Sequence, residues 1–279
     1  MSMGSRPIAA EVLPLARRLG KVMGLVLLLA ACNGGETADV TPDQPPEQLY
    51  NHAQDLLEEG SFEEAGRAFE EVERQHPYSQ WATRGQLMAA YAYYEANKYD
   101  EAITAAQRYI DLHPGSRDVP YAYYMVGMSY YEQISDVGRD QEMTQKALES
   151  FTDLIRRFPD SNYAADAKLK VDLVRDHLAG KEMEVGRYYQ RRQLWLAGIN
   201  RFQKVVTDYQ TTTHVPEALH RLVECYLALG MTQQAQEAAA VLGYNFPGSE
   251  WYDRAYALLQ GRNLEPREGE GNSWLSGLF

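Results

Sequence analysis

The chain has 279 residues, of which 45% are hydrophobic and 24% are charged, and its formal net charge is −12. Nucleic-acid binding relies on basic patches that attract phosphate, so we expect no nucleic-acid partner for so acidic a protein. The sequence has only two cysteines, Cys32 and Cys225, and therefore predicts no disulfide framework.

Residues 1–31 are predicted to be a secretory signal peptide. Basic residues precede an apolar run at 22–30 that is too short to cross a bilayer as a helix. The run Leu-Ala-Ala-Cys that ends at Cys32 resembles a bacterial lipobox. This resemblance implies cleavage before Cys32, acylation of that cysteine and a lipid anchor in the membrane. A plain signal peptide followed by a chance cysteine is the alternative.

Asn33 follows the cysteine, where the sorting rule known for enteric lipoproteins has aspartate in proteins kept in the inner membrane. The resemblance therefore implies the outer membrane. Residues 32–45 are small, polar and acidic, which predicts a flexible tether. The 14 steps from Cys32 to Pro46 span at most ~45 Å when extended.

Proline recurs in similar settings along the rest of the chain, at Pro77, Pro114, Pro159 and Pro247. Each proline ends an amphipathic stretch, because proline cannot continue the hydrogen-bond ladder of a helix. Small and large apolar residues between the prolines follow the 34-residue tetratricopeptide (TPR) spacing. The predicted fold class is all-α: a solenoid of five TPR-like helical hairpins over residues 46–262.

Two units depart from the regular repeat. The third contains a polar, loop-like insertion at 134–141. The fourth is predicted to begin with one long helix over 164–192 and to continue with a second helix over 196–209. Residues 263–279 are predicted to be a flexible C-terminal tail, with an apolar clip onto this protein or a neighbour as the alternative.

Several large side chains on the first helices of units two and three fall at positions that face the concave side of a TPR stack. They are Tyr91, Tyr94, Tyr124, Met128 and Tyr131. One interpretation is a client-peptide groove, since a concave aromatic surface suits extended peptides. The other is packing or incidental exposure, and the sequence leaves both open.

The sequence gives little sign of catalysis. It contains no phosphate-binding glycine loop, G-x-S-x-G elbow or H-E-x-x-H motif, and its six histidines are scattered. Cys225 lies among apolar residues and is predicted to be a buried filler. The repeats leave no room for a catalytic domain. We therefore expect a protein that is not an enzyme and has no metal site and no cofactor.

The order of these features resembles the BamD family, TPR lipoproteins of the outer-membrane β-barrel assembly machinery. Four stretches carry the resemblance: residues 49–53; the loop at 134–141; Lys-Glu-Met-Glu-Val-Gly-Arg-Tyr-Tyr at 181–189; and Ala-Gly-Ile-Asn-Arg-Phe at 197–202 with Glu-Ala-Leu at 217–219. The third stretch is far more specific than the TPR pattern itself.

The resemblance implies a subunit at the periplasmic face of the outer membrane. It implies contact of the C-terminal repeats with BamA, association with other assembly-complex subunits, and reception of unfolded outer-membrane β-barrel proteins by the N-terminal repeats. Arg201 matches a family arginine at the BamA contact. The alternative is a periplasmic TPR scaffold lipoprotein that recruits peptidoglycan or cell-division enzymes.

Overall fold

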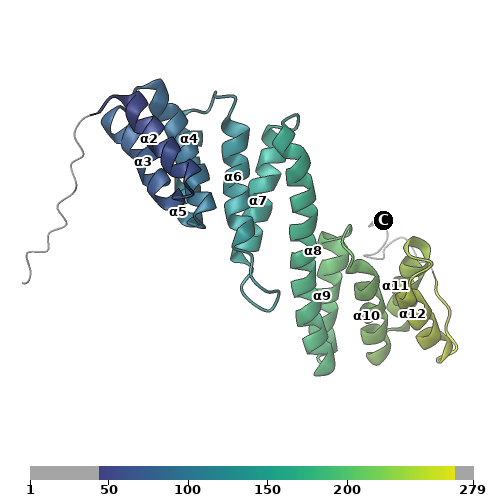
Figure 1. Ribbon diagram of the computed structural model, residues 1–279. Coiled ribbons are helices and arrows are strands. Elements are labelled where there is room, and N and C mark those ends of the chain that lie inside the picture. The colour runs from purple at the N-terminus through teal and green to yellow at the C-terminus, as the bar shows by residue number, and fades with distance from the viewer. Residues whose placement is uncertain (1–43, 268–279) are drawn as a thin grey trace, which may run out of the picture. The chain divides into compact units, whose positions relative to one another are not determined.

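The computed structural model describes residues 44–267, and the regular structure within them is helical (Figure 1). The eleven helices of this part of the chain are α2 (Pro46–Glu58), α3 (Phe62–Gln75), α4 (Gln80–Glu95), α5 (Tyr99–Leu112), α6 (Val119–Glu132), α7 (Glu142–Arg157), α8 (Asn162–Arg191), α9 (Trp195–Asp208), α10 (Val215–Ala228), α11 (Thr232–Asn245) and α12 (Glu250–Gln260). The predicted signal peptide, Cys32, nearly all of the tether and most of the tail lie outside the described residues.

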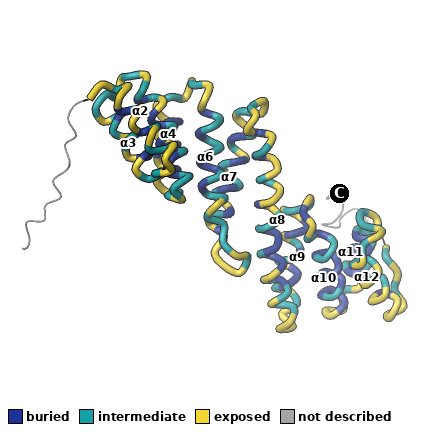
Figure 2. Tube along the Cα trace, in the orientation of Figure 1, coloured by how far each residue is buried: buried dark blue, intermediate teal, exposed yellow. Residues whose placement is uncertain are grey.

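Consecutive helices pair into five hairpins, α2–α3, α4–α5, α6–α7, α8–α9 and α10–α11, and α12 follows as a single helix. Each helix packs against the next one along the chain. Figure 2 shows buried positions along the sides of the helices that meet their neighbours. The predicted all-α solenoid of five hairpins is confirmed.

The recurring proline motif acts at both of its ends. The helix before it stops ahead of the proline, and a serine two residues after the proline caps the next helix at three of the four sites. Ser79, Ser161 and Ser249 each accept a hydrogen bond from the backbone N–H three residues on, at 3.0, 3.2 and 3.2 Å. Such caps satisfy a donor that the first turn of a helix leaves free. The same short motif therefore closes one hairpin and opens the next.

A glycine faces an aromatic ring at four interfaces between adjacent helices. The pairs are Gly66 with Tyr93, Gly127 with Phe151, Gly186 with Phe202 and Gly243 with Tyr252. A Cβ on any of these glycines would lie closer than 3.0 Å to the ring, a distance that real Cβ atoms essentially never show. The aromatic ring of each pair thus packs directly on the backbone of the facing helix.

The two irregular units are helical where the sequence predicts helices. The long helix of the fourth unit is α8, with 30 residues, and its ends differ from the predicted ones by at most two residues. The predicted loop at 134–141 lies between α6 and α7, and Lys181 Nζ on α8 donates to the carbonyl oxygen of Gly138 at 3.0 Å. None of the helices in the described range is both long and apolar enough to cross a membrane.

Candidate functional site

The first helices of the hairpins form one side of the array. α2 contacts α4, α4 contacts α6, α6 contacts α8, and α10 contacts α12. Between α8 and α10, side-chain hydrogen bonds and ion pairs make the connection. We call the surface of α2, α4, α6, α8, α10 and α12 the A face, and it is the side on which the TPR spacing places the predicted groove.

The structure brings the predicted groove residues together on neighbouring helices of the A face. Tyr91 and Tyr94 lie on α4, and Tyr124, Met128 and Tyr131 lie on α6. All five side chains are half-buried. Met128 and Tyr131 also pack against the core cluster of α7 and α8. The residues therefore combine packing between repeats with partial exposure, and the client-peptide groove stays a prediction.

Tyrosine hydroxyl groups link the first helices of successive hairpins. Tyr94 Oη donates to Glu132 Oε1 at 3.4 Å, from α4 to α6. Tyr124 Oη donates to Asp166 Oδ2 at 2.7 Å, from α6 to α8. The ring of Tyr131 lies 4.4 Å from Lys170 Nζ, a cation–π contact to α8. These contacts fix how each first helix lies against the next.

The pKa values of three phenol groups in this region, those of Tyr91, Tyr94 and Tyr124, are raised. Burial raises the pKa of Tyr94 to about 12, with a further contribution from the charge of Glu132. Burial and the hydrogen bond to Asp166 also raise the pKa of Tyr124. Burial and the neighbouring Glu95 raise the pKa of Tyr91. These hydroxyl groups are therefore neutral, and those of Tyr94 and Tyr124 donate to carboxylates on the next first helix.

Two further tyrosines belong to this region and were not predicted. The ring of Tyr163, at the start of α8, lies 5.3 Å from those of Tyr121 and Tyr124. Tyr163 follows the proline motif at Pro159, so its place in the first turn of the next first helix was readable from the sequence. Tyr121 lies three residues before Tyr124 on α6, one helical turn away.

Arg201 lies on α9, the second helix of its hairpin, and not on the A face. Its Nη1 is 2.9 Å from Glu182 Oε2, and Lys204 Nζ is 2.7 Å from the other oxygen of the same carboxylate. The Arg201 side chain is 41% exposed, so one ion pair within the chain leaves part of the guanidinium accessible. The predicted lipidation site, Cys32, lies outside the described residues.

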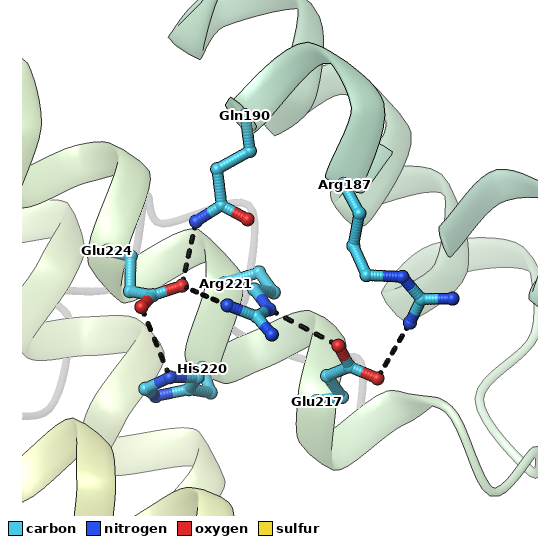
Figure 3. Close-up of polar contacts among 6 residues, drawn as sticks. All are labelled: Arg187, Gln190, Glu217, His220, Arg221 and Glu224. Atoms are coloured by element: carbon cyan, nitrogen blue, oxygen red, sulfur yellow. Dashed lines mark hydrogen bonds and ion pairs between the residues drawn. The ribbon is translucent and has the colours of Figure 1, made fainter. Parts of the chain in front are cut away.

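Sequence analysis missed a polar cluster that joins α8 to α10 (Figure 3). Arg187 donates to Glu217 at 2.9 Å, and Gln190 donates to Glu224 at 2.7 Å. Arg221 bridges the two carboxylates, with its Nε 3.2 Å from Glu217 and its Nη1 2.9 Å from Glu224.

The cluster is partly withdrawn from water. His220 Nε2 lies 3.5 Å from Glu224, and the imidazole is buried beside the ring of Trp251 on α12, 5.5 Å away. Burial alone raises the pKa of Glu224. The polar contacts of its carboxylate outweigh burial and lower that pKa to about 2. Glu224 is therefore a carboxylate at all ordinary pH values.

One signal in the sequence points to a basic surface at the end of α8 and along α9. The chain has no acidic residue between Glu184 and Asp208, whereas five basic residues fall there: Arg187, Arg191, Arg192, Arg201 and Lys204. In a chain of net charge −12 such a stretch stands out. Its partners on α10 are not adjacent in sequence, so the stretch indicates a basic surface but not the cluster itself.

The described residues offer little for covalent or metal chemistry. Cys225 is buried on α10, and burial raises the pKa of its thiol to about 12. Within residues 44–267 no group of three or more His, Cys, Asp or Glu side chains is placed to hold a metal ion. The predicted role of Cys225 as a buried filler is confirmed.

The hairpin array and its A face of aromatic and charged side chains define a helical-repeat protein of the tetratricopeptide class. Such proteins present extended surfaces along stacked repeats. Residues 42–242 match the YfiO family, described as outer membrane lipoprotein. The chain belongs to this family.

Relatives named outer membrane protein assembly factor BamD support this assignment. The protein of Caulobacter vibrioides is 50% identical over 227 residues, which cover 81% of this chain and 74% of the relative. The protein of Rickettsia prowazekii is 42% identical, covering 87% of this chain and 98% of the relative. The protein of Neisseria meningitidis serogroup A is 35% identical, covering 84% of this chain and 92% of the relative.

Proposed function

We propose that this chain is a non-catalytic, lipid-anchored subunit of the outer-membrane β-barrel assembly complex, held at the periplasmic face of the outer membrane by Cys32. The observation that carries the proposal is the 50% identity to an outer membrane protein assembly factor over 81% of the chain. An array of stacked hairpins supports it, since repeat proteins hold other polypeptides along a continuous surface.

In this proposal the two ends of the array have different partners. The A face around Tyr91, Tyr94 and Tyr124 receives unfolded outer-membrane proteins, because half-buried tyrosines offer apolar contact area, and hydroxyl oxygens that can still accept a hydrogen bond, with little side-chain entropy to lose. The second helix of the fourth hairpin contacts BamA through the accessible part of Arg201.

Depletion of the chain in its own host tests the overall function. Barrel proteins of the outer membrane should fall in abundance while lipoproteins of that membrane persist, which quantitative proteomics of purified membranes would measure. Unchanged porin levels after full depletion would rule the proposal out. Recovery of peptidoglycan hydrolases without BamA on the affinity-purified chain would favour the alternative scaffold.

The BamA contact is tested by a matched pair of substitutions on α9. Arg201→Gln and Lys204→Gln each remove one ion pair to Glu182, so they disturb the fold to a similar extent. Arg201→Gln should lower the amount of BamA that co-purifies with the chain, and Lys204→Gln should leave it near the wild-type level. Equal recovery of BamA with both variants would show that Arg201 is not a contact residue.

A further inference from the structure

A cavity of about 350 Å³ lies beside the polar cluster that joins α8 to α10. It is lined by Arg187, Gln190, Arg191, Trp195, Arg221 and Glu224. The cavity opens between two first helices at the end of α8, and the start of α9 supplies the tryptophan. We call it the arginine pocket. It is separate from the tyrosine region of α4 and α6.

The three arginines of the pocket differ in whether they already have an ion-pair partner within the chain. Arg187 and Arg221 are held by ion pairs to glutamates of α10. Arg191, at the last turn of α8, is exposed and has no hydrogen-bond or ion-pair partner among the described residues. The pocket therefore combines two fixed guanidinium groups with one that is free to pair with an incoming anion.

Charge in the surrounding segment favours an acidic occupant. Arg201 and Lys204 share the single carboxylate of Glu182, and Arg187 shares Glu217 with Arg221. The basic groups of 185–207 thus outnumber the carboxylates that they contact. A guanidinium forms two parallel hydrogen bonds with a carboxylate, a geometry that an ammonium group does not match.

Trp195 supplies the apolar side of the pocket. Its side chain is half-buried and packs against the core cluster of α8–α12, so its position is fixed before any partner arrives. The pocket is a recess between two helices. Such a recess accepts single side chains of an extended chain, whereas a lipid surface presents a layer of headgroups. An acidic side chain next to an apolar one fits this combination.

We propose that the arginine pocket binds an acidic segment of an extended polypeptide partner, with a carboxylate on Arg191 and a neighbouring apolar side chain on Trp195. The inference does not depend on the proposed function of the tyrosine region, because it rests on different residues and a different ligand chemistry.

Peptide titration of the full chain in detergent tests the inference. The probe is a dye-labelled peptide of alternating glutamate and phenylalanine, followed by fluorescence anisotropy at low ionic strength. The matched peptide has lysine in place of glutamate. Arg191→Glu is compared with Arg117→Glu, an exposed arginine between α5 and α6 whose change alters the net charge equally. Far-UV circular dichroism checks that both variants remain folded.

We expect the glutamate peptide to bind more tightly than the lysine peptide. Arg191→Glu should raise its Kd roughly tenfold, the effect of losing one charge-assisted hydrogen-bonded pair. Arg117→Glu should change the Kd by less than about twofold, because a distant exposed charge is screened. Equal binding of the two peptides, or equal loss in the two variants, would overturn the proposal.

Two other occupants give distinct results. Phosphatidylglycerol vesicles that bind through Arg191 while the glutamate peptide does not would identify a lipid site and overturn the proposal. The chain's own residues 268–279 include Glu268 and Glu270, so the titration is repeated with a chain that ends at Arg267. Peptide binding that appears only in this shortened chain would mean that the tail occupies the pocket, and a separate partner would be excluded.

Discussion

From α4 to the start of α8, tyrosine hydroxyl groups join neighbouring first helices, whereas from the end of α8 to α10 the Arg187–Glu217 ion pair and the Gln190–Glu224 hydrogen bond join them. Neutral hydroxyl donors respond little to salt or to pH in the ordinary range. Ion pairs respond to both. Both regions are built from the same kind of helical hairpin, yet different polar side chains connect their first helices. The comparison teaches that the polar groups of the A face can vary along the array while the hairpin stays the same.

The largest effect is expected at the glycine–aromatic contacts between helices, which both regions contain. Gly127→Ala and Gly186→Ala should each lower the free energy of unfolding by about 3 kcal/mol, because the new methyl group overlaps the ring of Phe151 or Phe202. Urea titration followed by circular dichroism measures the change. Gly115→Ala is the control, since no atom lies within 4 Å of its added Cβ. A cost at one glycine only would show that the two regions are packed by different rules.

Acid should weaken the α8–α10 region through Glu224. The pKa of Glu224 is about 2 in the folded chain against 4.5 for an unperturbed glutamate, so the unfolded chain binds more protons between these values. The stabilisation is complete above pH 4.5 and is lost as the pH falls towards 2.

Glu224→Gln should cost about 2 kcal/mol at pH 7, and the difference from wild type should vanish near the lower pKa. Urea titrations at a series of pH values measure both. Should the variant and the wild type lose stability in parallel as the pH falls, Glu224 would not be the titrating group that separates the two regions.

The smallest expected effect comes from one tyrosine hydroxyl. Tyr124→Phe removes the hydrogen bond to Asp166 and should lower the free energy of unfolding by about 1 kcal/mol. The loss should be the same at low and high salt. Tyr78→Phe is the control, because Tyr78 is fully exposed. A smaller loss of unfolding free energy in high salt would show that this contact behaves like an ion pair. The two regions would then not differ in their response to salt.

Local signals account for most of the fold that the sequence predicted. A helix that stops before Pro77 and a new one capped by Ser79 need only neighbouring residues, and the same holds at Pro159 and Pro247. The long α8 was readable from its own composition. The repeat position of Tyr94 and Tyr124 predicted that they lie on the first helices of their hairpins, α4 and α6.

The hydrogen-bond partners of those residues could not be predicted from the sequence. Tyr124 bonds to Asp166, 42 residues away, and Gln190 bonds to Glu224, 34 residues away. Each pairing depends on the rotation of one first helix against the next, which packing decides. The cluster on α8 is harder still to predict, because a 30-residue helix interrupts the regular spacing of the repeats. The acid-free stretch at 185–207 indicates only that a basic surface exists.

The first and last helices of the described array both expose charged or polar side chains. The exposed positions of α2 include Asn51, His52 and Asp55, and those of α12 include Asp253 and Arg254. A stack of identical units would otherwise expose an apolar helix face at its end. A second molecule could pack against that face, and repeated packing would build filaments. Hydrated side chains on these two end helices disfavour such end-to-end packing and leave the long sides of the array as the surface for unlike proteins.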